Sequence, residues 1–245
     1  MTVALFIPCY VNQFYPDAAK ATLQLLQKLG VTVVYPPKQT CCGQPMANSG
    51  FEHLSQGCSD LFIENFSGFD YIVAPSASCV LHVKDHLHSA KNEYEAKSIR
   101  GKIYELVEFM TDILKVEKLD AIFPHKVGIH HSCHGLRGLH LAQMSELNAE
   151  PYSKPKQLLD MVQGLEQVTL DRPDECCGFG GTFCVAEEAV SVKMGKDRVT
   201  DHTKNGAEYI TSSDMSCLMH LEGILHRKKS LVKVVHIAEI LNATV

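Results

Sequence analysis

Chemistry in this sequence is concentrated in its ten cysteines, four of which stand as two adjacent pairs. Each pair is followed by glycine, in Cys41-Cys42-Gly43 and in Cys176-Cys177-Gly178. Neighbouring Cα atoms lie about 3.8 Å apart across a trans peptide, whereas a disulfide usually needs about 4.4 Å or more. The two thiols of such a pair are therefore poorly placed to bridge each other, and well placed to bind one metal centre together.

Both cysteine pairs belong to a longer pattern that occurs twice in the chain. The stretch 68–82 aligns without a gap on 206–220, which matches Cys79 with Cys217 at an offset of 138 residues. The adjacent pairs match at an offset of 135, and Cys9 matches Cys133 at an offset of 124. Offsets that grow along the chain indicate small insertions in surface loops. We therefore expect a duplicated half, with a boundary near residues 119–124.

The elements that must position these cysteines are short apolar strands alternating with helices. A buried parallel strand is predicted at 3–8, and further strands are predicted at 31–35, 70–74, 126–131, 167–170 and 209–211. Helices are predicted between them, at 17–29 with Asp17 as its cap, 51–66, 102–114, 155–162 and 183–203. This order predicts an α/β fold of two pseudo-symmetric halves, each a small parallel sheet flanked by helices.

In such a sheet the loops beyond the carboxyl ends of the strands gather at one edge, where ligands bind. The cysteines that follow the strands should therefore meet in two sites. The first would hold Cys9, Cys41, Cys42 and Cys79, and the second Cys133, Cys176, Cys177 and Cys217. Four thiolates suit zinc or an iron–sulfur cluster, and two adjacent ligands favour a centre with several metal atoms.

Glycines and histidines accompany both predicted sites. The glycines that would let the backbone approach a cluster are Gly43, Gly178, Gly180 and Gly181. Helices starting directly after the Cys-Cys-Gly turns would aim N–H groups at the sulfurs. His82 and His220 lie one helical turn beyond Cys79 and Cys217. Three roles are open for them: metal ligand, hydrogen-bond donor to a sulfur, or ordinary capped or core residue.

The composition and charge of the chain exclude several classes of function. With 245 residues, 45% of them hydrophobic, the chain can bury a core, and its net charge of −5 gives no electrostatic basis for nucleic-acid binding. No apolar run reaches the roughly 18 residues of a transmembrane segment. The segment from Met1 to Pro8 is expected to be a strand rather than a signal peptide. We therefore expect a cytoplasmic protein whose cysteines serve metal or redox chemistry.

The duplicated pattern resembles the cysteine-rich (CCG) domain, known from heterodisulfide reductase, the glycolate oxidase iron–sulfur subunit and the lactate-utilisation protein A group. The resemblance covers nearly the whole chain and implies two such domains, 1–120 and 121–245. The stretch from Cys176 to Phe183 is most similar to the last group. That group implies an electron-transfer subunit, with one or two [4Fe–4S] clusters, acting with two partner subunits to oxidise L-lactate to pyruvate.

The sequence departs from the family pattern where its closing Cys-x-x-Cys is Cys79-x-x-His82 and Cys217-x-x-His220. Three kinds of metal centre remain open for these sites: a conventional cubane cluster, a variant cluster, and zinc in one of the two sites. Two other functions also remain: a catalytic subunit that reduces a disulfide or quinone, and a zinc-stabilised assembly module without redox activity. No catalytic residue is assigned from the sequence.

Overall fold

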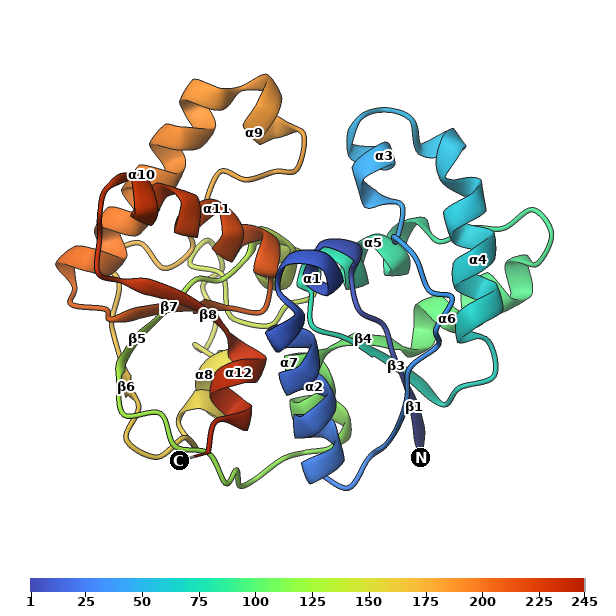
Figure 1. Cartoon of the computed structure of the whole chain (residues 1–245), viewed down its shortest axis with the longest axis horizontal. Helices are drawn as coiled ribbons and strands as arrows, with labels where there is room; N and C mark the ends of the chain where they lie inside the picture. The colour runs from blue at the N-terminus through green and yellow to red at the C-terminus, as the bar shows by residue number, and fades with distance from the viewer. Residues whose placement is uncertain (245) are drawn as a thin grey trace.

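The computed structural model describes residues 1–244, which contain two four-stranded parallel sheets, one in each half of the sequence (Figure 1). The strand order is β2-β1-β3-β4 in the first sheet and β6-β5-β7-β8 in the second. The strands are β1 (Thr2–Leu5), β2 (Thr32–Val34), β3 (Tyr71–Ala74), β4 (Ile103–Glu105), β5 (Lys126–Ile129), β6 (Glu166–Gln167), β7 (Tyr209–Ser212) and β8 (Lys233–His236). The predicted α/β fold with two similar halves is confirmed.

Helices cover both sheets. Those of the first half are α1 (Cys9–Phe14), α2 (Pro16–Lys28), α3 (Gln44–Asn48), the 3₁₀ helix η1 (Glu52–Ser55), α4 (Gln56–Phe66), α5 (Ala77–His86), α6 (Glu93–Lys102), α7 (Leu106–Glu108) and the π-helix η2 (Phe109–Ile113). Those of the second half are the π-helix η3 (His134–Gly138), α8 (Lys154–Leu159), α9 (Phe183–Ala186), α10 (Glu188–Lys204), α11 (Met215–Arg227) and α12 (Ile237–Asn242).

Each sheet has two inner strands, and β1 of the first sheet is buried because helices lie on both faces of that sheet. In β1, Val3, Ala4 and Leu5 are at most 2% exposed, and Val3 pairs with Val33 on one side and with Tyr71 on the other. In β5, the corresponding strand of the second half, Val127 pairs with β6 and β7 in the same way. Continuous apolar runs made these strands predictable.

Helix α2 joins the two halves. Its apolar residues recur at helical spacing, and Ala18, Ala21, Leu25 and Leu26 are buried. This face contributes to a hydrophobic cluster that also contains Val127 and residues of α12. Helix α2 packs directly against α12, and Figure 1 shows the two helices side by side between the sheets. The halves therefore share a core.

Four helix predictions were wrong in detail. The stretch 102–114 is the end of α6 followed by β4, α7 and η2, because Ile103 pairs with Ile72 as the fourth strand of the sheet. Helix α2 begins at Pro16, with Tyr15 rather than Asp17 at the N-cap position. The long helix expected at 183–203 is broken at Glu187, whose φ of −122° and ψ of 49° are not helical. The helix expected at 51–66 begins as η1 before continuing as α4.

The halves also meet where β3 and β7 end. Ser76 and Asp214, which stand at matching positions in the repeat, form an antiparallel bridge, and the Ala77 N–H donates to the Ser213 carbonyl at 3.1 Å. Among residues 1–244, no helix is long and apolar enough to cross a membrane.

Candidate metal centres

In the first half, three separate segments bring four thiols together. Cys9 opens α1 just after β1, Cys41 and Cys42 follow β2, and Cys79 lies in the first turn of α5 after β3. These thiols lie close enough to perturb one another: Cys41 raises the pKa of the Cys9 thiol, and Cys41 and Cys79 raise the pKa of the Cys42 thiol. We call these four residues the first thiol group.

The second half repeats the arrangement. Cys133 directly precedes η3, Cys176 and Cys177 follow β6, and Cys217 lies in the first turns of α11. Cys176 raises the pKa of the Cys133 thiol, Cys176 and Cys217 raise the pKa of the Cys177 thiol, and the Sγ atoms of Cys177 and Cys217 lie within 4.8 Å of each other. These four residues are the second thiol group. All eight cysteines are free thiols, so their convergence does not come from disulfide bonding.

A left-handed glycine shapes each Cys-Cys-Gly turn. Gly43 has φ of 93° and Gly178 has φ of 88°, a conformation that L side chains rarely adopt. Space is also restricted, since a Cβ on Gly178 would lie 2.7 Å from the Ser191 carbonyl oxygen. The turns fold the backbone over the sulfurs: the N–H of Gly43 points at Cys41 Sγ and that of Gly178 at Cys176 Sγ, both at 3.4 Å.

These N–H groups come from the turns rather than from helix N-termini alone. Helix α3 does begin directly after Gly43, as expected. After Gly178, however, the chain passes through Gly180 and Gly181, both with positive φ, before α9 begins at Phe183. Helix α9 thus begins at the residue predicted for the start of the long helix, and these glycines separate it from the second cysteine pair. The Phe179 N–H supplies a further donor, 3.5 Å from Cys177 Sγ.

The thiols within each group titrate very differently. Hydrogen bonds from Cys42 and Cys9 lower the pKa of Cys41 to about 2, and hydrogen bonds from Cys133 and Cys177 lower the pKa of Cys176 to about 2. The same bonds, together with burial, raise the pKa of the thiols of Cys9, Cys42, Cys133 and Cys177. Each group can thus hold one thiolate by itself, and further deprotonation needs a positive centre among the sulfurs, which a metal ion supplies.

The histidines singled out from the sequence lie beside the thiol groups. His82 is 8% exposed, stacks on His86 with ring centroids 5.0 Å apart, and burial lowers its pKa to about 4. A Cβ on Gly43 would lie 3.6 Å from His82 Nε2, so this ring flanks the first Cys-Cys-Gly turn. His220 is less buried, and its Nε2 lies 3.4 Å from the Ser191 carbonyl oxygen.

A different histidine, His130, lies close to two of the sulfurs. Within residues 1–244, one group of three potential ligand atoms lies within 4.8 Å of one another, and it comprises His130, Cys177 and Cys217. His130 is 1% exposed, neither ring nitrogen has a hydrogen-bond partner, and burial lowers its pKa to about 3. The sequence shows His130 only as one of three histidines around Cys133, and nothing in the spacing separates it from His131 or His134.

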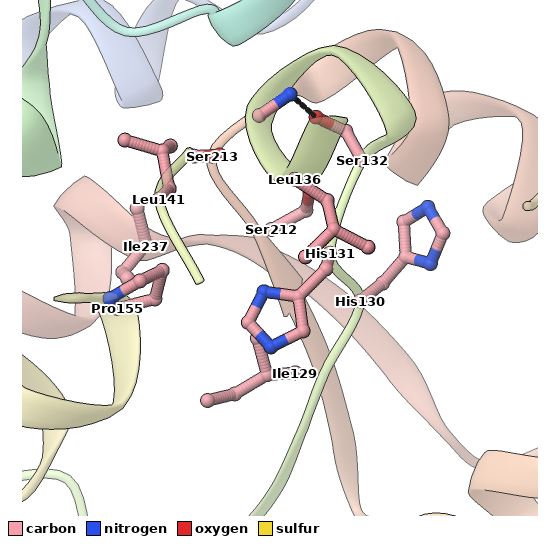
Figure 2. Close-up of a pocket in the computed structure, with 11 residues that line it drawn as sticks. Ile129, His130, His131, Ser132, Leu136, Leu141, Pro155, Ser212, Ser213 and Ile237 are labelled. Carbon is pink, nitrogen blue, oxygen red and sulfur yellow. Dashed lines mark hydrogen bonds between the residues drawn. The ribbon is translucent and has the colours of Figure 1, made fainter. Parts of the chain in front are cut away.

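Figure 2 shows how His130 and His131 leave the end of β5 in different directions. The His131 ring lies beside a cavity of only about 10 Å³ that Leu141, Pro155 and Ile237 also line. At that size the cavity holds no more than a water molecule. The His130 ring points away from these apolar side chains, toward the second thiol group.

The remaining two cysteines stand outside both groups. Cys184 donates its S–H to the Gly181 carbonyl at 3.0 Å, and Ser49 occupies its matching position in the first half. Cys58 is half-buried in α4, where burial raises the pKa of its thiol. Neither makes a hydrogen bond to one of the eight grouped thiols.

Comparisons with known proteins agree with the duplicated arrangement. A family model described as a cysteine-rich domain (CCG) matches the chain twice, at residues 3–84 and 127–222. Lactate utilization protein A of Exiguobacterium sp. is 39% identical over 98% of this chain and 96% of its own length. Lactate utilization protein A of Bacillus subtilis is 38% identical over 99% of this chain and 100% of its own.

Among solved structures, a hypothetical protein from Helicobacter pylori superposes with a TM-score of 0.61 at 15% identity. The match covers 98% of this chain and 48% of that one, and it supports the fold alone. The sequence relatives and the two family matches carry the assignment. The chain belongs to the cysteine-rich (CCG) domain family, in the group of lactate utilization protein A.

Proposed function

We propose that this chain binds an iron–sulfur cluster in each half and serves as the electron-transfer subunit in the oxidation of L-lactate to pyruvate. One observation carries the proposal: each half brings four free thiols from three segments close together, where they perturb one another's pKa values. The relatives named lactate utilization protein A connect this arrangement with lactate.

The residues of each site suit a cluster of [4Fe–4S] type. Such a cluster moves single electrons at a potential set by its ligands, hydrogen bonds and burial. The ligands would be Cys9, Cys41, Cys42 and Cys79 in domain 1–120, and Cys133, Cys176, Cys177 and Cys217 in domain 121–245. The turn N–H groups and His82, His130 and His220 would lie around the sulfurs, with Gly43, Gly178, Gly180 and Gly181 allowing close approach.

Partner subunits are part of the same proposal. The sequence contains no dinucleotide fingerprint after its first strand, so we assign hydride or electron-pair removal from lactate to another component. Two partner subunits, acting in the cytoplasm, would supply that step and accept the electrons. This chain would connect them as a carrier of single electrons.

The proposal is tested by anaerobic purification followed by iron, sulfide and zinc analysis and by electron paramagnetic resonance. We expect iron and acid-labile sulfide at both sites, and a brown protein that bleaches with dithionite. Cys177→Ser should remove roughly half of the iron, because each half binds its own centre. The matched control is Cys58→Ser, which changes a cysteine outside both groups and should keep all of the iron. Loss of all iron in Cys177→Ser would contradict two separate sites.

Zinc in the second site is the second candidate, favoured by one observation. His130, Cys177 and Cys217 already lie within 4.8 Å of one another, an arrangement that a single tetrahedral ion could use. A colourless protein with one equivalent of zinc and no iron would support the zinc site and contradict the iron–sulfur clusters. The metal would then contribute to folding rather than to electron transfer.

A further inference from the structure

A large cavity lies outside both thiol groups, and the proposed function does not use it. It has a volume of about 610 Å³ and lies between α10, α11 and the segment 179–188. Ligand sites for small organic molecules usually measure about 300–1,000 Å³. A three-carbon acid such as lactate would leave most of this space empty.

The inner part of the cavity is apolar. The Phe179 ring, Val192 of α10, and Met219 and Ile224 of α11 line it, and Ile224 is 6% exposed. An aromatic ring and aliphatic side chains of this kind suit the flat or apolar body of an organic molecule.

Three cations surround the opening: Lys196 of α10, Arg227 at the end of α11, and Lys228. Within residues 1–244, none of them forms an ion pair, and Lys228 donates to the Thr200 hydroxyl at 3.2 Å. Basic residues at a helix C-terminus are favoured by the helix dipole, which explains Arg227 and Lys228 without a ligand. Lys196 lies in the middle of α10, where the dipole gives no such reason.

The only acidic side chain lining the cavity within the described chain is Glu188. It lies eight residues before Lys196 on the same helix, about 12 Å along the axis. Three cations against one distant carboxylate give the opening a positive charge, although the whole chain carries a net charge of −5. That charge favours an anionic group on the occupant.

The first half does not repeat the residues that line this cavity. By the offset of 138 residues, His86 replaces Ile224, and Ser89 replaces Arg227. The His86 ring stacks on His82, and its Nδ1 pairs with Glu52 Oε1 at 2.8 Å. The positive charge supplied by Arg227 is therefore specific to the second half.

The cavity also reaches the second thiol group. His220 and Phe179 line it, with ring centroids 6.2 Å apart, and the Phe179 N–H points at Cys177 Sγ. A molecule bound in the cavity would thus be separated from the sulfurs of the second thiol group by a single side chain.

We propose that this cavity binds a small organic anion whose ring or other apolar body packs against Phe179, Val192 and Met219 while its phosphate or carboxylate contacts Lys196 and Arg227. The proposal holds for whichever metal the thiols bind, because none of these five residues is a proposed metal ligand. Its failure would therefore leave the metal proposal untouched.

The test is calorimetric binding to the full chain, purified anaerobically, with two pairs of probes. Flavin mononucleotide is compared with riboflavin, and 2-naphthoate with 2-naphthol, so that each anion has a neutral partner with the same ring. We expect at least one anion to bind about tenfold or more tightly than its neutral partner, which corresponds to about 1.4 kcal/mol. The pair that shows this difference identifies phosphate or carboxylate as the anionic group.

Two variants locate the binding. Arg227→Gln should weaken the anion about tenfold, whereas Lys193→Gln, the same charge change at an exposed residue paired with Asp197, should not. Gly223 lines the cavity, and a Cβ there meets no atom within 4 Å, so Gly223→Leu should fill the space and abolish binding. Gly101→Leu, at an equally open glycine of α6, is its control.

Neutral probes that bind as tightly as both anions would overturn the proposal. Unchanged binding in a folded Gly223→Leu protein would overturn it as well, since the ligand would then occupy another place.

Discussion

At the scale of single residues, the two thiol groups differ most at one pair of positions. His130 matches Phe6 at the offset of 124 residues, and the backbone confirms the match: the N–H of Phe6 donates to the Val73 carbonyl at 2.9 Å, and that of His130 to the Thr211 carbonyl at 2.7 Å. Phe6 packs edge-on against Phe62 and Phe66. His130 instead lies among sulfurs with both ring nitrogens unpaired. The two centres should therefore differ in potential.

The first prediction is that His130→Phe lowers the reduction potential of the second centre by on the order of 60 mV, equivalent to about 1.4 kcal/mol for one electron. A neutral buried imidazole can donate an N–H to a cluster sulfur, which stabilises the reduced, more negative state. Redox titration followed by electron paramagnetic resonance measures the change, with the first centre as internal control. An unchanged potential would exclude this donor role, and loss of half of the iron would make His130 a ligand.

At the scale of elements, helix α10 approaches α11 and the second Cys-Cys-Gly turn very closely. A Cβ on Gly195 of α10 would lie 2.1 Å from Ile224 Cδ1, 2.8 Å from His220 Nε2 and 3.2 Å from the Cys177 carbonyl oxygen. A side chain at this position must displace the ends of the Ile224 and His220 side chains or move α10 away from the turn that carries Cys177. Gly223 of α11, by contrast, has open space around its Cβ position.

The same substitution should therefore have opposite effects on these two helical glycines. Gly223→Ala should raise the free energy of unfolding by about 0.5–1 kcal/mol, because alanine restricts the unfolded chain and favours the helix. Gly195→Ala should lower it by about 1–3 kcal/mol through overpacking. Urea denaturation of both variants measures the difference. Stabilisation by Gly195→Ala would show that α10 is free to move away from α11.

These elements also show what the sequence could and could not predict. Apolar runs such as Val3 to Ile7 identified the inner strands, and the repeat correctly grouped Cys9 with Cys41, Cys42 and Cys79. Strand β4 was missed because the apolar residues from Ile103 to Met110 also fit a helical period. The position of His130 and the cavity beside Lys196 depend on how α10 and α11 pack, which no local pattern determines.

At the scale of the whole molecule, a buried carboxylate connects the loops that carry Cys79 and Cys217. Asp214 is 0% exposed, and its Oδ2 accepts from the Ser78 N–H of the other half at 2.8 Å. Its Oδ1 accepts from the Ser216 hydroxyl at 2.8 Å and from the Tyr10 hydroxyl at 3.2 Å. Together with the core shared by α2 and α12, these bonds should make both halves one cooperative unit.

The last prediction is that the chain unfolds in a single transition and that Asp214→Asn lowers its stability by roughly 1–3 kcal/mol. The carboxylate accepts from one backbone N–H on each oxygen, that of Ser78 on Oδ2 and that of Ser216 on Oδ1, so an amide NH₂ in place of either oxygen leaves one of these donors unsatisfied. Asp197→Asn, which changes a carboxylate in an exposed pair with Lys193, is the matched control and should cost less than about 1 kcal/mol. Urea unfolding followed by circular dichroism and by fluorescence measures both variants. Two separate transitions in the unmodified chain would mean that each half folds independently, and Asp214 would then only cap α11.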